Sequence, residues 1–451
     1  MPDSLSIFRL GFSWFLGANR PQKLTTLFAA ALAIGTAFVF AFPSKIHLNV
    51  NTDYFTDYKP TAENILNGRG ILGADGQLEM RYPPGYSLFL VAAYEVGDIL
   101  RVNREKVIVG FNLITGAASS LFVYTTIELL FGASIALITW LLWATYIPGL
   151  VTFLHPNSEV PFMLFFFAAV WVFCLGVCRE QASAESGFFA GMLLGAAALV
   201  RPIAVFLPFV FIVVAVTLTF AAGKPEQRDT KVTSKLAAAV LLGFVLSIAP
   251  WELFIRAKTG QYILLSSNGP ATMSEGLIFG LTAGSGGGEV SLSPHLREVM
   301  ERANRERPEM RTDSAILRFV WNESVRNPGG VAELLLLKLR RPWYGMQSKS
   351  HEWSIIALQL PYLILGVCGL AFWLRAHRQN AAPVVFLCSL VVYFWAMACL
   401  VVPLLRYMVP TMAYVLTFVA VSLESMWAGA RQVATSNPAL LARGSLKAEV
   451  R

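Results

Sequence analysis

Long apolar blocks separated by short polar connections dominate the pattern along this chain. A helix needs about 20 mainly apolar residues to cross a bilayer, and ten blocks are close enough to that length to be interpreted as spans. The pattern predicts an all-α polytopic membrane protein, a helical bundle of about ten spans. The blocks cover residues 24–42, 107–126, 133–152, 160–178, 188–200, 203–221, 236–250, 354–374, 382–402 and 409–427.

The stretch 86–100 is also apolar, but we do not expect it to cross the membrane. It is short, carries Glu95 and Asp98, and follows Pro83-Pro84. These features favour a partly buried helix that lies along the outer membrane interface. With this stretch left out of the count and the N-terminus inside, the basic residues gather in the connections of one side, which the positive-inside rule makes cytoplasmic.

This orientation leaves two substantial segments on the outer face, where we expect the chemistry. The second segment contains a glycine-rich stretch at 280–288 and helical patterns around 294–307 and 313–327. The expected domains are an N-terminal membrane bundle (1–250) that includes the first outer loop (43–106), an outer or periplasmic segment (251–353), C-terminal spans (354–427) and a cytoplasmic tail (428–451).

Composition narrows the class of protein. Charged residues make up 14% of the chain and the mean hydropathy is +0.57. Soluble domains carry about 25% charged residues, so a soluble enzyme is not expected. The net charge of +8 suits two partners, the anionic surface of membrane lipids and a phosphate-bearing substrate. Nucleic acid is not expected as a partner, because the basic residues form no stripe.

The first outer loop holds the sharpest candidate cluster, in which Asp53 and Asp57 are each followed by a tyrosine, Tyr54 and Tyr58, that we expect to contact the substrate. Asp53 comes shortly after the first span, near the membrane surface. A carboxylate held there beside aromatic rings loses hydration, which suits it to take a proton from an acceptor hydroxyl. Two alternatives stay open: Asp53 caps the helix that follows, or Asp57 has the catalytic role.

A second motif, Arg81-Tyr82-Pro83-Pro84-Gly85, follows in the same loop. Paired prolines fix the backbone, and Gly85 permits a close turn into the next helix. We expect this motif to shape the floor of a pocket, with Arg81 and Tyr82 facing the substrate. A plain rigid turn explains the motif equally well.

Glu159 begins the fourth span, directly after His155-Pro156-Asn157-Ser158. A carboxylate at a helix N-terminus is favoured by the helix dipole, so a capping role is one interpretation. The other is a second catalytic carboxylate, because the position is predicted to face the same side of the membrane as Asp53.

Several cations lie at the predicted outer ends of spans. Arginine near hydrocarbon is costly and usually has a partner, and the guanidinium group grips a lipid phosphate with two hydrogen bonds. Snorkelling toward lipid headgroups is the alternative for any one of them. Together they indicate an anionic lipid substrate. They are Arg201, Arg256, Lys258, Arg340, Arg341 and Arg406, the last followed by Tyr407.

In their order and placement, these motifs resemble the bacterial GT-C glycosyltransferases of the integral membrane, which include protein mannosyltransferases and the transferases that decorate lipid A with aminoarabinose or galacturonate. The resemblance covers residues from about 24 to 425. It rests on the early Asp, Asn67-Gly68-Arg69-Gly70, Tyr82-Pro83-Pro84-Gly85-Tyr86, Ser158-Glu159, Leu199-Val200-Arg201-Pro202, Pro250-Trp251, Trp343-Tyr344-Gly345 and Arg406-Tyr407-Met408-Val409-Pro410.

The resemblance implies a helical membrane bundle with juxtamembrane helices and the catalytic Asp in its first outer loop. It assigns Asp53 as the base or the acceptor-binding carboxylate and Glu159 as a second acidic residue lining the cavity, with Arg201, Arg256 and Arg406 as candidate phosphate contacts. Two departures stand out. The spacing from Asp53 to the following helix is one residue longer than the family pattern, which keeps Asp57 in contention, and Arg256 is displaced from the usual position after Pro-Trp.

The implied activity is an inverting transfer of a sugar from a polyprenyl phosphate donor to a hydroxyl of a lipid, glycan or protein acceptor. The implied place is the outer face of the bacterial inner membrane, where such enzymes modify lipopolysaccharide or other envelope glycans. The scheme requires no cofactor, although a divalent cation, Mg²⁺ or Mn²⁺, stays open. Two alternatives are an outer-leaflet glycan polymerase or ligase, and a transporter of lipid-linked sugar without covalent chemistry.

Overall fold

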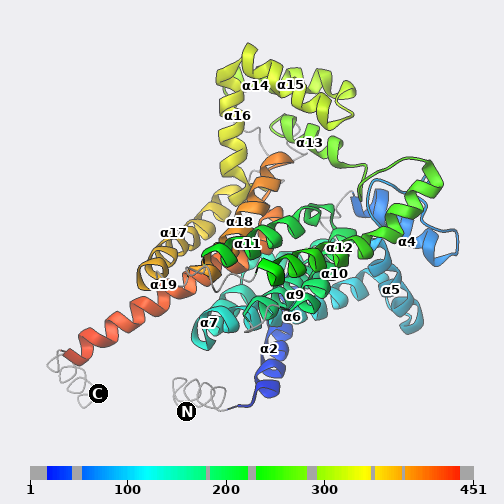
Figure 1. The fold of residues 1–451 in the computed structure, drawn as a ribbon. Coiled ribbons are helices and arrows are strands. Elements are labelled where there is room, and N and C mark those ends of the chain that lie inside the picture. Colours follow the sequence, from blue (N-terminus) through cyan, green and yellow to red (C-terminus); the bar gives the residue numbers. More distant parts are fainter. Residues whose placement is uncertain are drawn as a thin grey trace. The chain divides into compact units, whose positions relative to one another are not determined.

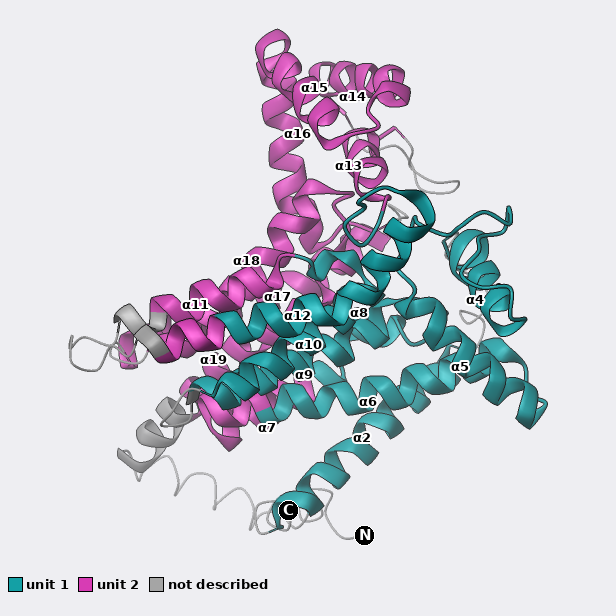
Figure 2. Cartoon of the chain, turned by 45° about the vertical axis from the view of Figure 1, so that its right-hand side comes forward, with its two compact units in different colours: residues 1–125, 143–205, 238–266 teal, residues 126–142, 206–237, 267–451 magenta. Residues whose placement is uncertain are grey.

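The computed structural model describes residues 18–42, 53–178, 183–221, 230–281, 292–346, 351–377 and 381–436. Most of the predicted glycine-rich stretch 280–288 lies outside these residues. Within them the chain is helical, and the β structure amounts to one isolated bridge between Leu72 and Leu78 (Figure 1). The chain forms two compact units, which interleave along the sequence (Figure 2).

Unit 1 comprises residues 1–125, 143–205 and 238–266. It contains the described part of the first loop and several of the helices that follow it. Its elements are α2 (Arg20–Ala41), the π-helical turn η1 (Tyr54–Tyr58), α4 (Lys59–Leu66), α5 (Gly85–Leu100), most of α6 (Arg104–Phe131), α8 (Ile147–Val151), α9 (Glu159–Cys178), α10 (Ala184–Val200), η2 (Pro202–Ala204) and most of α12 (Thr230–Thr259).

Unit 2 comprises residues 126–142, 206–237 and 267–451. It contains the last turns of α6 and the first turns of α12. Its other elements are α7 (Ala133–Ala144), α11 (Leu207–Ala221), α13 (Gly269–Ile278), α14 (Pro294–Glu306), η4 (Arg307–Glu309), α15 (Asp313–Arg326), α16 (Pro328–Arg340), η5 (Arg341–Trp343), α17 (Glu352–Ala376), α18 (Ala382–Leu400), η7 (Leu405–Tyr407) and α19 (Val409–Ser436).

Every predicted span falls mainly on helical residues, and the predicted fold class is confirmed. Seven helices in the described part of the chain are long and apolar enough to cross a membrane: Arg20–Ala41, Arg104–Phe131, Glu159–Val177, Val232–Thr259, Glu352–Ala376, Ala382–Leu400 and Val409–Trp427. The other three predicted spans fall on shorter apolar helices, Ala133–Ala144, Ala184–Val200 and Pro202–Thr217. The domains expected from the sequence are consecutive segments, each defined by whether it lies in the membrane or on one side of it. This division stays a prediction.

At two prolines the helices differ from the predicted spans. The predicted span 133–152 is interrupted, because Tyr146 is extended and a new short helix, α8, begins before Pro148. Pro148 has no N–H to donate to the carbonyl oxygen of Ala144, the last residue of α7, so α7 does not continue into α8. The span predicted to end at Pro250 instead runs through it to Thr259. Burial of Trp251 and Ile255 beyond the proline favours the longer helix.

Small residues bring helices of unit 1 close together. A Cβ atom on Gly191 of α10 would collide with the carbonyl oxygen of Val240 on α12, and one on Gly243 of α12 would collide with that of Phe188 on α10. The two backbones are therefore in direct contact along this seam. Such close approach is typical of small residues spaced by four in membrane helices.

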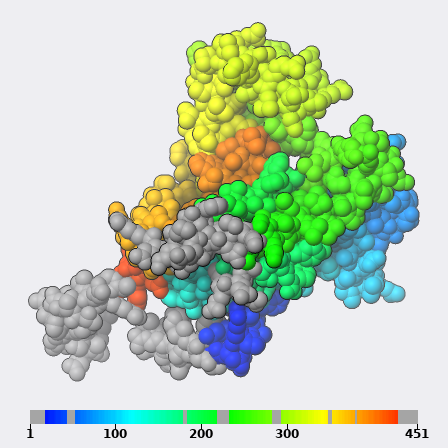
Figure 3. Space-filling model, viewed as in Figure 1, coloured from blue at the N-terminus to red at the C-terminus, as the bar shows by residue number. Residues whose placement is uncertain are grey.

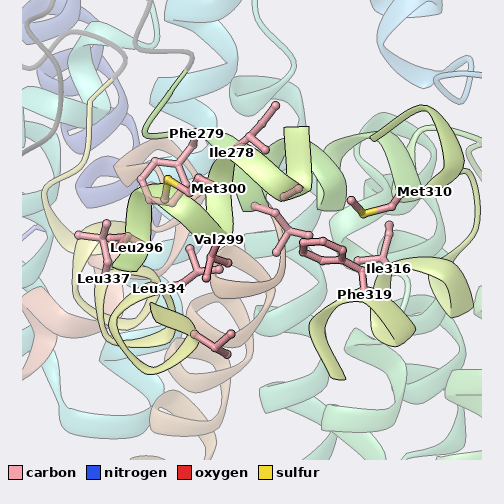
Figure 4. Packing of buried hydrophobic residues seen from close by; sticks show 13 residues of the cluster. Ile278, Phe279, Leu296, Val299, Met300, Met310, Ile316, Phe319, Leu334 and Leu337 are labelled. Atoms are coloured by element: carbon pink, nitrogen blue, oxygen red, sulfur yellow. The ribbon is translucent and has the colours of Figure 1, made fainter. Parts of the chain in front are cut away.

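In unit 2, helices α13 to α16 enclose a hydrophobic cluster of their own (Figure 4). Helices α14 and α15 match the predicted helical patterns, and the space-filling view shows α14 to α16 as one packed body in yellow (Figure 3). The cluster repeats at helical spacing, as an amphipathic helix requires. Its members include Phe279, Leu296, Val299, Met300, Ala303, Ile316, Phe319, Leu334 and Leu337.

Candidate active site

The first element that the structure describes in the first loop is a π-helical turn. Asp53 precedes η1, which continues without a break into α4. A π turn accommodates one residue more than an α turn, and such turns are frequent at functional sites. The spacing from Asp53 to the following helix is one residue longer than the family pattern, and the π-helical turn accommodates this extra residue. The turn buries Tyr54, Asp57 and Tyr58.

Asp57 is held by several partners. Its Oδ1 lies 3.4 Å from Nη1 of Arg81, and the hydroxyl of Thr56 donates to its Oδ2 at 2.5 Å. The side chain of Thr61 donates to the Asp57 carbonyl oxygen at 2.8 Å. Asp57 is buried, whereas the Arg81 side chain is about half exposed (49%). The carboxylate of Asp57 is therefore engaged in orienting Arg81.

Glu79 fixes the backbone of this arginine. Its Oε1 accepts hydrogen bonds from the backbone N–H groups of Arg81 at 2.6 Å and Tyr82 at 3.2 Å. Burial raises the pKa of Glu79, and the two backbone hydrogen bonds oppose that shift. Glu79 was not among the site residues predicted from the sequence. Its position two residues before Arg81 is the one signal that could have suggested a side-chain-to-backbone turn.

Tyr58 connects the first loop to the start of α9. Its ring packs on Tyr82 (4.7 Å between centroids) and on Tyr86 (4.9 Å), and its hydroxyl is hydrogen-bonded to Ser158. Burial raises the pKa of Tyr58; Tyr82 and Asp53 add to the rise and Arg201 opposes it. Tyr58 is therefore a neutral phenol at physiological pH and acts here through hydrogen bonding and packing.

Glu159 and Arg201 form a buried ion pair. Oε1 of Glu159 lies 2.5 Å from Nη1 of Arg201, which also donates to Oγ of Ser158 at 3.3 Å. The backbone N–H of Glu159 donates to Oδ1 of Asn157 at 3.1 Å. Asn157 therefore caps the first N–H group of α9. The carboxylate of Glu159, for which capping was one interpretation, is paired with Arg201.

Gly85 gives the proline motif its place beside Arg201. A Cβ atom on Gly85 would come within 2.5 Å of the Leu199 carbonyl oxygen and 2.9 Å of the Val200 nitrogen. Real Cβ atoms do not approach backbone this closely, so the start of α5 packs against the end of α10 only with glycine at this position. This contact supports the architectural interpretation of the motif.

Asp53 belongs to the same neighbourhood. It is half-buried, and its charge contributes to the pKa shifts of Tyr58 and Arg81. Partial burial alone would lower the pKa of Arg81, but Tyr82, Asp57 and Asp53 outweigh that effect and raise it. Unit 1 thus gathers two aspartates around a permanently charged guanidinium.

The remaining predicted site residues have other surroundings. The hydroxyl of Tyr54 pairs with that of Tyr94 at 2.9 Å in the interior. The guanidinium of Arg256 stacks on the exposed ring of Tyr262, with 3.8 Å from Cζ to the centroid, and Lys258 is exposed on the same last turns of α12. Arg406 and Tyr407 belong to unit 2, where Nη2 of Arg406 donates to the Tyr407 hydroxyl at 3.1 Å.

The described residues contain no group of three or more His, Cys, Asp or Glu side chains placed to hold a metal ion. Asp57 and Glu159 are each paired with an arginine. Each of these carboxylates therefore has a cationic partner within the protein itself.

Comparison with known proteins matches part of this site. Residues 83–253 match the model of the dolichyl-phosphate-mannose-protein mannosyltransferase family. The match includes Glu159 and Arg201 and begins after Asp53 and Arg81. A search of curated proteins finds no match.

Several solved structures are similar to the chain. They include structures of the Archaeoglobus fulgidus oligosaccharyltransferase, of which two are compared with the chain. The one tethered with an acceptor peptide containing the NVT sequon has 12% identity and a TM-score of 0.57, over 95% of this chain and 52% of that chain. The one in complex with Zn and sulfate has 14% identity and a TM-score of 0.53, over 92% and 51%.

A third structure, ArnT from Cupriavidus metallidurans bound to undecaprenyl phosphate, has 13% identity and a TM-score of 0.41, over 93% of this chain and 80% of that one. The chain spans about half the length of the oligosaccharyltransferase chains that it matches. Its helical bundle therefore has the GT-C fold of membrane glycosyltransferases, and residues 83–253 carry the sequence pattern of the dolichyl-phosphate-mannose-protein mannosyltransferase family.

Proposed function

We propose that the chain is a membrane glycosyltransferase that moves a sugar from a polyprenyl phosphate to a hydroxyl group. The observation that carries the proposal is the cluster in unit 1, where Asp53 and Asp57 lie in the electrostatic neighbourhood of the half-exposed Arg81. The match over residues 83–253, to a family named for a dolichyl-phosphate-mannose donor, supports the choice of donor class.

The reaction is an inverting displacement at the anomeric carbon. The bond from that carbon to the phosphate oxygen breaks, and the lipid phosphate leaves with the electron pair. A bond to the acceptor oxygen forms, and the acceptor proton passes to a carboxylate. Phosphate is already a good leaving group, so cationic stabilisation of its charge and a positioned base are the main contributions required of the protein.

The contacts divide the roles between the two aspartates. Asp57 is buried and bound to Arg81, Thr56 and the turn itself, so we assign it to the orientation of Arg81. Asp53 is the base, because it stands half-buried at the entrance of the turn. Arg81 is the first candidate for the phosphate, since its side chain is half exposed.

The buried pair of Glu159 and Arg201 has a supporting role in this scheme. Arg201 is largely enclosed and engaged by Glu159 and Ser158, so it contributes positive potential to the site and holds the Tyr58 contact in place. Arg256, Lys258, Arg406 and Tyr407 remain proposed contacts of the lipid donor.

We further propose that the site faces the outer side of a bacterial inner membrane, and that the acceptor is a lipid, a glycan or a protein. The Archaeoglobus fulgidus oligosaccharyltransferase was solved with an acceptor peptide, so peptides belong in the panel of acceptors. The positive-inside pattern of the connections supports the sidedness.

The test is transfer by the purified protein in lipid nanodiscs. A panel of radiolabelled polyprenyl phosphate sugars is incubated with lipid, glycan and peptide acceptors, and the release of lipid phosphate is followed with the label in the acceptor. Stoichiometric release and labelling with one donor supports the proposal. Turnover of diphosphate-linked donors alone would instead assign the chain to the polymerase or ligase class, and movement of donor across the bilayer without cleavage would make it a transporter.

A further inference from the structure

We infer that residues 260–266 form a strap that positions Arg81, and that Glu252 and Ser266 are positioning residues for the reaction. The inference rests on the proposed function and adds residues from α12 and its following loop to the site. All of them belong to unit 1.

The strap contains a backbone conformation that needs support. α12 ends at Thr259, and Gly260 follows with a φ of +71°. Leu265 has a φ of +59°, in the left-handed region that a residue with a branched aliphatic side chain rarely enters. Such a conformation persists only when the surroundings determine it, and it is frequent where a functional site needs a fixed geometry.

Two side chains of one α12 turn hold Leu265. Its N–H donates to Oε1 of Glu252 at 2.7 Å, and its carbonyl oxygen accepts from Nε1 of Trp251 at 2.9 Å. The Leu265 side chain is almost completely buried (1% exposed). The backbone is thus fixed through its N–H group, its carbonyl group and its side chain at the strained residue itself.

Because Leu265 is fixed, the next residue, Ser266, is held beside Arg81. The hydroxyl of Ser266 donates to the Arg81 carbonyl oxygen at 2.5 Å. On the other side of the same residue, the Arg81 N–H donates to Glu79, and the guanidinium contacts Asp57. Arg81 is therefore held through its N–H group, its carbonyl group and its side chain.

The strap does not provide the reacting groups. The Glu252 carboxylate is directed at a backbone N–H, and the Ser266 hydroxyl at a backbone carbonyl. Their effect reaches the reaction through the orientation of Arg81. A misplacement of about 1 Å in a catalytic constellation can lower a rate about 100-fold, so a strap of this kind acts on turnover more than on donor affinity.

The test compares deletion and conservative variants at the two positions. Glu252→Gln keeps a side-chain carbonyl that can accept from Leu265, and Ser266→Thr keeps a hydroxyl, whereas Glu252→Ala and Ser266→Ala remove the acceptor and the donor. Ser119→Ala is the matched control, because that buried hydroxyl donates to Gly116 within its own helix. Hydrogen exchange of the amides of residues 79–82 and the transfer kinetics are measured for all five variants and the wild type.

We expect Glu252→Ala and Ser266→Ala to speed exchange at residues 79–82 and to lower kcat at least about tenfold, with KM for the donor changed less than threefold. The conservative variants and Ser119→Ala should stay near the wild type in both measurements. Unchanged exchange in both alanine variants would overturn the strap, and faster exchange with unchanged kcat would overturn its positioning role. The exchange arm needs no donor, so it tests the strap even if the wild type transfers none of the sugars offered.

Discussion

The carboxylate of Glu159 lies 2.5 Å from the guanidinium of Arg201, and both side chains are largely buried. Glu159 is the first residue of α9, and Arg201 immediately follows α10. The pair therefore joins the beginning of one helix to the end of the next. The shared contact with Ser158 extends this connection to Tyr58 in the first loop.

Removal of one partner from this pair should be more harmful than removal of both. Arg201→Met leaves the Glu159 charge buried without compensation, which costs about 3–5 kcal/mol. The double variant Glu159→Gln with Arg201→Met removes the charge as well and should regain much of that loss. Thermal unfolding in detergent, followed by tryptophan fluorescence, measures both. A double variant no more stable than Arg201→Met alone would contradict this account of the pair.

Substitution of Gly85 should disturb the site through packing. Gly85→Ala places a methyl group against the backbone at Leu199 and Val200, and such overpacking costs about 1–3 kcal/mol. Gly110→Ala is the matched control, because a Cβ atom there meets nothing within 4 Å and alanine favours the helix. We expect a lower Tm for Gly85→Ala and an equal or higher Tm for Gly110→Ala. Equal Tm values for Gly85→Ala and the wild type would show that α5 does not need this close contact.

Lys338 in α16 should make stability depend on alkaline pH. Its Nζ donates to the Gly276 carbonyl oxygen at 2.8 Å, in a buried position. Burial lowers its pKa from 10.5 to about 8. Between about pH 8 and 10.5 the unfolded chain still binds the proton that the native chain has lost, so native stability rises with pH in this window. Below about pH 8 both states are protonated and the contribution stops changing.

The measurement is Tm against pH from 7 to 10 for the wild type and Lys338→Met. The wild type should gain Tm relative to the variant as pH rises above about 8. Parallel curves over the whole range would mean that Lys338 does not titrate in this window in the folded protein.

Spans were the part of the fold that the sequence predicted best, because the bilayer sets the length of an apolar helix directly. Helix ends were predicted less well. Pro148 and Pro250 carry the same local signal, yet one lies at a helix break and the other inside a helix. The difference depends on packing around each proline, which a sequence pattern does not contain.

The sequence predicted several residues of the candidate site, but not which of them pair with one another. Asp57, Arg81, Glu159 and Arg201 were all recognised as candidates, but their division into two ion pairs depends on contacts between distant segments. In the sequence, Lys338 lies in an apolar run that resembles a lipid-facing helix. In the structure, its Nζ donates to a carbonyl oxygen of α13. Such partners become visible only when the chain is folded.

The account depends most on Asp53, and the rate of lipid phosphate release by Asp53→Asn tests it most directly. The donor is the polyprenyl phosphate sugar that the wild type accepts, with Asp57→Asn measured in parallel. Loss of a general base lowers a rate about 100-fold to 10,000-fold. We predict such a loss for Asp53→Asn at unchanged Tm, and a smaller loss for Asp57→Asn. Release by Asp53→Asn at close to the wild-type rate would contradict the proposed reaction.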